Sequence, residues 1–205
     1  MENKSDELAV KRSEEIINAC ETLYETMKFR DITIKEIGAE TSFSRTSVYN
    51  YFQTKEEIFL ALMKREYNKW INSLNEICDK NSCLDKHSLA SLIAHSLEKR
   101  HNLLKLLSMN LYDIEENSRI ERLVDFKKTY KAAISALKNI LDKFCKYMTD
   151  DEKEKFIYSF LPFMFGIYPY VCVTEKQKTA MNIAELDYPK LSIYEIVYSF
   201  IEKLF

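Results

Sequence analysis

The chain has 205 residues, of which 46% are hydrophobic, but it holds only 2 Gly and 3 Pro. So few turn-forming residues argue against an all-β or α/β fold and favour an all-α fold of long helices. The formal net charge is -2, and residues 1–60 carry 8 Lys and Arg against 12 Asp and Glu. Any contact with nucleic acid must therefore come from a local patch of side chains and not from bulk charge.

The five cysteines are odd in number, form no C-x-x-C pair, and follow a polar amino terminus. We therefore expect free thiols in a cytoplasmic protein. Cys78, Cys83 and His87 lie close together, but a zinc site needs a fourth ligand that the spacing does not supply. The chain also lacks a Gly-rich phosphate loop, G-x-S-x-G and H-E-x-x-H. We expect no enzyme activity, no cofactor and no metal.

In chain order, residues 1–10 look like a loose polar tail, and a first helix is predicted over residues 11–27. Its apolar stripe is Ile16, Cys20, Leu23 and Met27, at the three-to-four spacing of an amphipathic helix.

The second helix is predicted to begin at Thr33, because Thr33-x-x-Glu36 has the spacing of a capping box. A turn at residues 42–44 leads to a third helix from Arg45 to about Phe52, with Val48 and Phe52 on its buried side.

The exposed side of this third helix carries groups that reach base edges and phosphates in DNA. These groups are Arg45, Thr46, Ser47, Tyr49, Asn50 and Tyr51. The pattern predicts DNA binding, and the alternative is a small helical bundle with an ordinary polar face.

A second capping-box spacing, Thr54-x-x-Glu57, marks the start of the fourth helix. The rest of the chain shows helical periodicity without a linker. The predicted helices cover residues 55–79, 86–99, 101–115, 119–148, 150–173 and 191–204.

Residues 156–173 contain no charged residue, and the length of this stretch is at the lower limit for a helix that spans a membrane. Pro162, Gly166 and Pro169 interrupt this stretch, and no basic loop sets an orientation. We expect no membrane association. A helix that is apolar on all sides is instead expected to pack against the core on one side and against a partner subunit on the other. The two prolines should kink that helix or end it early.

Residues 11–60 resemble the DNA-binding domain of the tetracycline-repressor (TetR) family of bacterial transcription regulators. The matching features are Phe29, Ile32-Thr33, Ile37-Gly38-Ala39, Ser44, Val48-Tyr49-x-Tyr51-Phe52 and Lys55-Glu56-Glu57-Ile58. Ser42 stands where the family usually has Gly, and serine can adopt a left-handed turn conformation there at some cost.

The resemblance implies a three-helix helix-turn-helix domain over residues 1–60 and a helical effector-binding and dimerisation domain over residues 61–205. The implied DNA-binding residues are Thr33, Lys35, Ser44, Arg45, Thr46, Ser47, Tyr49, Asn50, Tyr51 and Lys55. Residues 150–173 and 191–204 are expected to pair across a two-fold axis as a homodimer.

The implied partners are double-stranded DNA, read as a palindromic operator, and a small apolar effector that releases a repressor. Aromatic, Met and His side chains are candidates for the effector pocket. They are Met63, Tyr67, Trp70, His95, His101, Met109, Phe126, Tyr130, Phe163 and Tyr168. Two alternatives stay open: a regulator of lipid or general metabolism on the same fold, and a helical adaptor without DNA binding.

Overall fold

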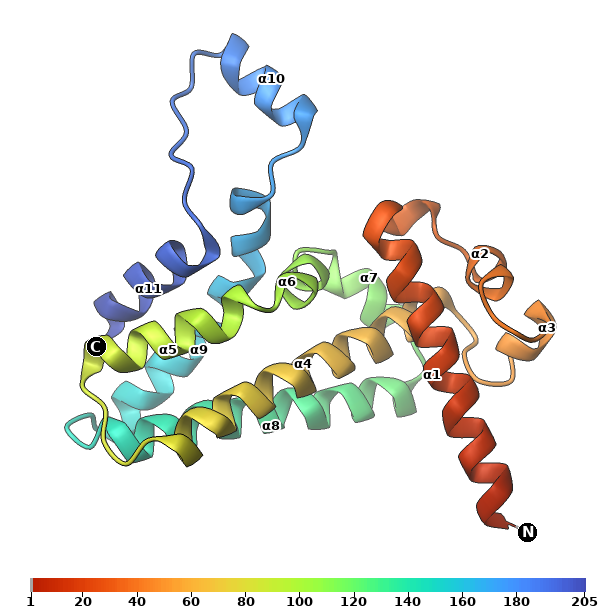
Figure 1. The fold of residues 1–205 in the computed structure, drawn as a ribbon, viewed down its shortest axis with the longest axis horizontal. Helices are drawn as coiled ribbons and strands as arrows, with labels where there is room; N and C mark the ends of the chain where they lie inside the picture. The colour runs from red at the N-terminus through yellow and green to blue at the C-terminus, as the bar shows by residue number, and fades with distance from the viewer. Residues whose placement is uncertain (1) are drawn as a thin grey trace. The chain divides into compact units, whose positions relative to one another are not determined.

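The computed structural model describes the backbone of residues 2–205 and the side chains from Asp6 onward. Over these residues it contains helices and no strand, which confirms the all-α prediction (Figure 1). The helices are α1 (Glu2–Thr26), the 3-10 helix η1 (Phe29–Asp31), α2 (Ile34–Ala39), α3 (Arg45–Val48), α4 (Lys55–Lys80), α5 (Lys86–Glu98), α6 (His101–Leu107), α7 (Leu111–Glu116), α8 (Ile120–Phe144), α9 (Asp150–Val171), α10 (Glu175–Ile183) and α11 (Ile193–Leu204).

The chain divides into two compact units whose boundaries differ from the expected division after residue 60. The first unit runs to Arg65 and also takes Asn110–Lys128 from the middle of the chain. The second unit consists of Glu66–Met109 and Thr129–Phe205. Two long helices, α4 and α8, therefore contribute residues to both units.

In the first unit, α1 packs its apolar stripe against the start of α4. Ile16 and Cys20 are fully buried, and the rings of Tyr24 and Phe59 meet edge to face at 5.2 Å. The predicted tail at residues 1–10 was wrong from residue 2 onward, because α1 begins at Glu2. Glu, Lys, Leu and Ala in this stretch are good helix formers and nothing there breaks a helix.

In the second unit, α11 packs on α5 and α9, and α6 packs on α9. Trp70 of α4 is fully buried and donates from Nε1 to the Ser96 hydroxyl at 3.0 Å. The rings of Phe163 and Phe200 stack at 3.8 Å, which joins α9 to α11. This core holds the C-terminal helices together.

Helix α9 continues past both of its prolines to Val171, so the helix ends at neither Pro162 nor Pro169. A proline has no N–H to donate to the carbonyl four residues before it. Both prolines lie on the exposed side of α9, so water can hydrogen-bond to those carbonyls instead. Helix α10 was not among the predicted helices, although Thr174 and Gln177 form a complete capping box at its start.

Helix α10 lies at the far end of a long excursion of the chain between α9 and α11 (Figure 1). Among the described residues, no single helix is long and apolar enough to cross a membrane. The pair α9 and α10 meets that criterion only jointly, and it is bent by 77°.

Candidate DNA-binding site and effector region

The start of α2 is fixed by Thr33, as its spacing to Glu36 predicts. The Thr33 hydroxyl accepts hydrogen bonds from the backbone N–H of Lys35 at 3.1 Å and of Glu36 at 3.5 Å. The Glu36 carboxylate accepts from the Thr33 hydroxyl, where a full capping box would have it accept from the Thr33 backbone. Thr33 and Lys35 themselves are exposed.

Gly38 lets α2 and α3 approach closely. A Cβ atom placed on Gly38 would lie 3.1 Å from Cα and 3.2 Å from Cβ of Arg45, which is tighter than ordinary contact. A larger residue at position 38 would therefore push apart the two helices of the helix-turn-helix.

The turn between α2 and α3 does not use the left-handed conformation at Ser42. Among the described residues other than glycine, positive φ occurs at Glu185 alone. Instead, the Ser42 backbone N–H donates to the Glu15 carboxylate of α1, a bond that lowers the pKa of Glu15. The Thr41 hydroxyl also donates to the Gly38 carbonyl at 2.9 Å. With these bonds the turn forms without a left-handed residue, so serine fits at position 42.

Helix α3 is shorter than predicted, because it ends at Val48 and continues to Tyr51 as turns. The backbone N–H groups of Tyr51 and Phe52 both donate to the Val48 carbonyl, at 2.9 and 3.0 Å. Ser44 precedes α3, but its hydroxyl contacts the Ser47 hydroxyl and caps no backbone group.

The buried side of this segment is the predicted one, since Val48 is 0% and Phe52 is 1% exposed. Because these two side chains point inward, the polar side chains point outward. Of the predicted DNA-binding residues on this segment, Ser44, Arg45, Thr46, Tyr49 and Asn50 are exposed, and Ser47 and Tyr51 are half-buried.

The Lys55 side chain is hydrogen-bonded within the protein, which the sequence did not predict. Its ammonium donates to the backbone carbonyls of Phe29 at 2.9 Å and Ile32 at 3.1 Å. The same ammonium lies 4.3 Å from the centre of the Phe29 ring. Since an ammonium has three N–H donors, two of them are used inside the protein.

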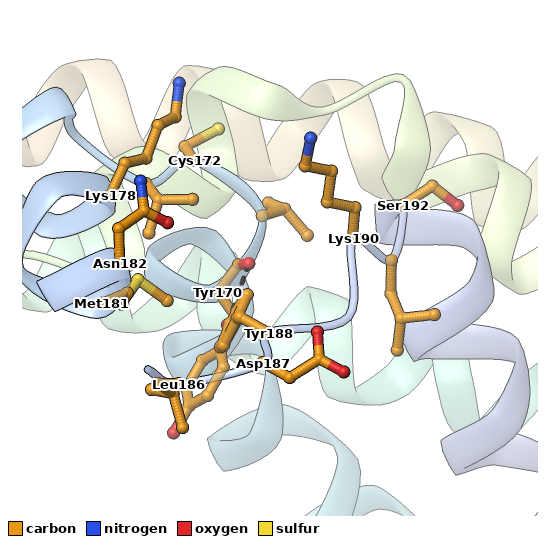
Figure 2. Close-up of a pocket in the computed structure, with 13 residues that line it drawn as sticks. Tyr170, Cys172, Lys178, Met181, Asn182, Leu186, Asp187, Tyr188, Lys190 and Ser192 are labelled. Atoms are coloured by element: carbon orange, nitrogen blue, oxygen red, sulfur yellow. Dashed lines mark hydrogen bonds between the residues drawn. The ribbon is translucent and has the colours of Figure 1, made fainter. Parts of the chain in front are cut away.

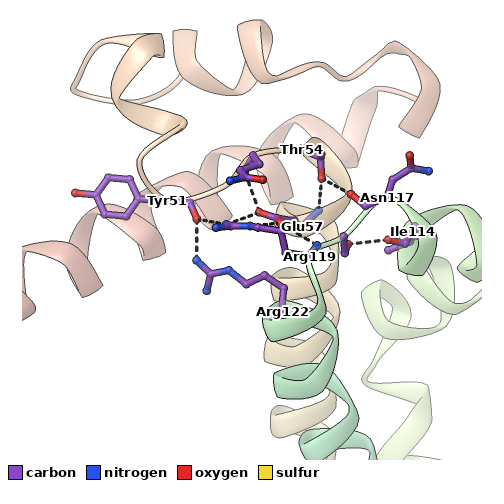
Figure 3. A network of polar contacts seen from close by, with 9 residues as sticks. Tyr51, Thr54, Glu57, Ile114, Asn117, Arg119 and Arg122 are labelled. Atoms are coloured by element: carbon purple, nitrogen blue, oxygen red, sulfur yellow. Dashed lines mark hydrogen bonds and ion pairs between the residues drawn. The ribbon is translucent and has the colours of Figure 1, made fainter.

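We call residues 44–51, which comprise Ser44, α3 and the turns after it, the recognition segment. A polar network, the Glu57 cluster, lies at the end of this segment and consists of Tyr51, Thr54, Glu57, Asn117, Arg119 and Arg122 (Figure 3). Glu57 is 0% exposed, yet its carboxylate accepts from the Gln53 backbone at 2.8 Å. It also accepts from Arg119 Nε at 2.6 Å, Arg119 Nη2 at 2.8 Å and the Arg119 backbone at 3.1 Å. The buried charge is thus paired and hydrogen-bonded, as a stable buried charge must be.

The other members of the Glu57 cluster also join residues 51–57 to residues 117–122 of the first unit. The Thr54 hydroxyl accepts from the Glu57 backbone at 3.2 Å, which starts α4, and donates to the Asn117 carbonyl at 2.9 Å. The Tyr51 carbonyl accepts from Arg122 Nη2 at 2.7 Å and from Arg119 Nη2 at 3.3 Å. Residues 117–122 are therefore bonded directly to the end of the recognition segment (Figure 3).

Sequence reasoning missed Asn117, Arg119 and Arg122, and it treated Glu57 only as a capping residue. Burial alone would raise the pKa of the Glu57 carboxyl, but hydrogen bonds from Arg119 and from the Gln53 backbone hold that pKa below its ordinary value. One feature of the sequence hinted that Glu57 is buried: it is followed by three apolar residues at 58–60, and all three are buried.

The ten residues proposed for the effector pocket differ widely in exposure. Met63, Tyr67 and Trp70 are 0% exposed and Phe126 is 3% exposed, so these side chains form core. His95 and His101 are exposed, and the His95 ring stacks on the Tyr194 ring at 4.4 Å. Met109, Tyr130, Phe163 and Tyr168 are half-buried. The pocket formed by these ten residues stays a prediction.

Two surface cavities of the second unit lie around the excursion between α9 and α11. The larger, of about 710 Å³, is bordered by polar and apolar side chains, including Lys178, Met181 and Lys190 (Figure 2). The smaller, of about 410 Å³, is lined almost wholly by apolar groups, among them Phe163 and Ile196. Phe163 is thus the one predicted pocket residue that borders either of these two cavities.

Comparison with known proteins places these features in a family. Residues 16–62 match the model of bacterial regulatory proteins of the tetR family, and residues 64–202 match the tetracyclin repressor-like C-terminal domain. A curated relative, the helix-turn-helix-type transcriptional regulator YfiR of Bacillus subtilis, is 31% identical over 72 residues. That match spans 35% of this chain and 35% of the relative.

Solved structures share the fold over nearly the whole chain. The fatty acid degradation regulator FadR from Bacillus halodurans is 11% identical, with a TM-score of 0.60 over 93% of this chain and 94% of its own. FadR from Bacillus subtilis, solved in complex with stearoyl-CoA, is 18% identical, with a TM-score of 0.59 over 93% and 96%. Because the C-terminal family model alone covers more than half of the chain, this protein belongs to the TetR family of DNA-binding transcription regulators.

Proposed function

We propose that this chain is a ligand-responsive repressor that binds a palindromic operator as a homodimer. The observation that carries the proposal is the row of exposed side chains on α3 and the turn after it, with Val48 and Phe52 buried behind them. A helix presented in this way fits the major groove of B-DNA. A two-fold dimer would read two half-sites one helical turn, about 34–36 Å, or a multiple apart.

Arg45 is our first candidate for reading a base. Its side chain is exposed and forms no hydrogen bond or ion pair with the described residues. A free guanidinium can donate two parallel hydrogen bonds to guanine. Thr46 and Asn50 lie beside it as further base contacts, and Tyr49, Thr33 and Lys35 as phosphate contacts. Lys55 becomes a secondary candidate, because its ammonium is already bonded to two carbonyls.

The proposed dimer interface is the outward side of α9 and α11. Tyr158 and Tyr170 on α9 are 58% and 62% exposed, although both are large aromatic residues. Gly166 lies on the same exposed side, and a Cβ atom there would meet nothing within 4 Å beyond its chain neighbours and the nearby backbone of its own helix. The apolar cavity between α9 and α11 continues this surface. A stable dimer needs about 800 Å² of such surface from each subunit.

For the effector, we propose a ligand with a long apolar chain, and specifically a long-chain acyl thioester. The support is the named ligand of the Bacillus subtilis FadR structure and the named role of its Bacillus halodurans counterpart. This choice favours the alternative in which the chain regulates lipid metabolism. Effector binding can release DNA only through a difference in affinity between the two states of the protein.

The test is a binding titration with the DNA upstream of the gene that encodes this chain. We expect retardation of a palindrome, and a loss of about 5- to 150-fold in operator affinity for Arg45→Ala, equal to about 1–3 kcal/mol. Lys128→Ala, which removes an exposed positive charge from α8, is the matched control. Stearoyl-CoA should reverse the retardation, and free coenzyme A should not.

The adaptor alternative gives the opposite result in the same titration. If the wild-type chain retards no palindrome from the neighbouring intergenic DNA, the regulator proposal is wrong. If it binds DNA but stearoyl-CoA changes neither the retardation nor the melting temperature, only the effector proposal is wrong.

A further inference from the structure

The carbonyl of Tyr51 is held from outside the helix-turn-helix by two arginines. Arg122 Nη2 donates to it at 2.7 Å and Arg119 Nη2 at 3.3 Å. Tyr51 is the last residue of the turns that extend α3, so its carbonyl marks the end of the recognition segment. Hydrogen bonds from a charged donor are about twice as strong as neutral ones, so these bonds fix that end firmly.

The two arginines are not equivalent. Arg119 is committed to Glu57, to which it donates from Nε, Nη2 and its backbone. Its bond to Tyr51 is the longer one and shares the Nη2 group with the Glu57 carboxylate. Removing Arg119 would leave a buried carboxylate without its partner, which affects folding before it affects DNA binding.

The side chain of Arg122 contacts Tyr51 and Phe52, at the end of the recognition segment and just after it. Besides its bond to the Tyr51 carbonyl, its guanidinium lies 5.1 Å from the centre of the Phe52 ring. Phe52 is 1% exposed and, with Val48, forms the buried support of α3. The side chain of Arg122 is half-buried, so it can be replaced without opening a large cavity.

We propose that Arg122 is a positioning residue for DNA recognition: it holds the Tyr51 carbonyl and the Phe52 ring, and thereby sets the angle at which α3 is presented. This inference rests on the proposed role of residues 44–51 at the DNA. Helix α3 needs such a support because it is four residues long and Ser44 supplies no side-chain cap. A four-residue helix cannot keep its own orientation without tertiary contacts.

The alternative role for an arginine in a DNA-binding unit is a direct phosphate contact, and salt dependence separates the two roles. Each lost phosphate contact lowers the slope of log affinity against log salt concentration by about one unit. A positioning residue touches no phosphate, so its loss weakens binding through geometry and leaves that slope close to the wild-type value.

The experiment measures operator affinity across a salt titration for the wild type, Arg122→Ala, Arg122→Lys and the control Lys128→Ala. We expect Arg122→Ala to lose about tenfold or more in operator affinity, with an unchanged slope and nearly unchanged affinity for random DNA. Arg122→Lys should recover part of the loss, because an ammonium can donate to the same carbonyl. Lys128→Ala should retain wild-type operator affinity.

Melting temperatures and the fraction of protein able to bind are measured on the same samples. A slope lower by about one unit would make Arg122 a phosphate contact and overturn the inference. Unchanged affinity would also overturn it, as would a loss that disappears once unfolded protein is discounted. If the wild type binds no palindrome at all, the proposed function fails and this inference fails with it.

Discussion

The sharpest consequence of the Glu57 cluster concerns the stability of the first unit. Replacing Arg119 with alanine removes the Nε and Nη2 donors at 2.6 and 2.8 Å and leaves Glu57, at 0% exposure, with two backbone donors. Breaking a buried ion pair in this way costs about 3–5 kcal/mol. We expect about 3 kcal/mol, the lower end, because the Arg119 side chain is 38% exposed and its loss opens little apolar space.

A loss of about 3 kcal/mol corresponds to a melting temperature lower by roughly 6–12 °C if the chain unfolds in one transition. Urea unfolding followed by circular dichroism measures the free-energy change, with Lys128→Ala as the control. In a Glu57→Gln background the cost of Arg119→Ala should fall to about 1 kcal/mol, because no buried charge is left unpaired. A cost below about 1 kcal/mol in the wild type, or an equal cost in both backgrounds, would refute the role given to the buried charge.

Three further predictions use other contacts. Glu57 has a lowered pKa, so its stabilisation is present above its ordinary value of 4.5 and is lost as pH falls through the lower folded value. The difference in urea midpoint between wild type and Glu57→Gln should therefore shrink below pH 4.5. Lys55→Ala should reduce stability by about 1–2 kcal/mol without changing the salt slope of DNA binding; a slope lower by about one unit would restore its phosphate assignment. Gly166→Glu should leave the subunit folded but shift sedimentation toward monomer, whereas Asn139→Glu on the exposed side of α8 should stay dimeric.

Local chemistry explains which parts of the fold could be predicted from the sequence. The start of α2 follows from one hydroxyl, that of Thr33, and two nearby backbone N–H groups. The buried side of α3 follows from the spacing of Val48 and Phe52. Both inferences need only neighbours within a few residues, and both are confirmed.

The roles of Lys55 and Glu57 depend on partners far away in the sequence, and periodicity carries no information about such partners. Lys55 bonds carbonyls 23 and 26 residues earlier, and Glu57 bonds an arginine 62 residues later. The end of α3 also involves a distant partner: the helix ends at Val48, turns follow it to Tyr51, and the Tyr51 carbonyl accepts a hydrogen bond from Arg122. A propensity argument that extends α3 to Phe52 cannot include that bond.

The Glu57 cluster also bears on what counts as the DNA-binding part of the molecule. The N-terminal family model covers residues 16–62, which include Glu57 but not Arg119. The Glu57 carboxylate has no exposure in the whole chain and is paired with Arg119, so helices α1–α4 alone would leave Glu57 without that cationic partner. Residues 110–128 supply that partner and, through Arg122, the support for the recognition segment. The smallest part of this chain able to present α3 to DNA should therefore include the middle segment, although that segment follows the helix-turn-helix by more than fifty residues.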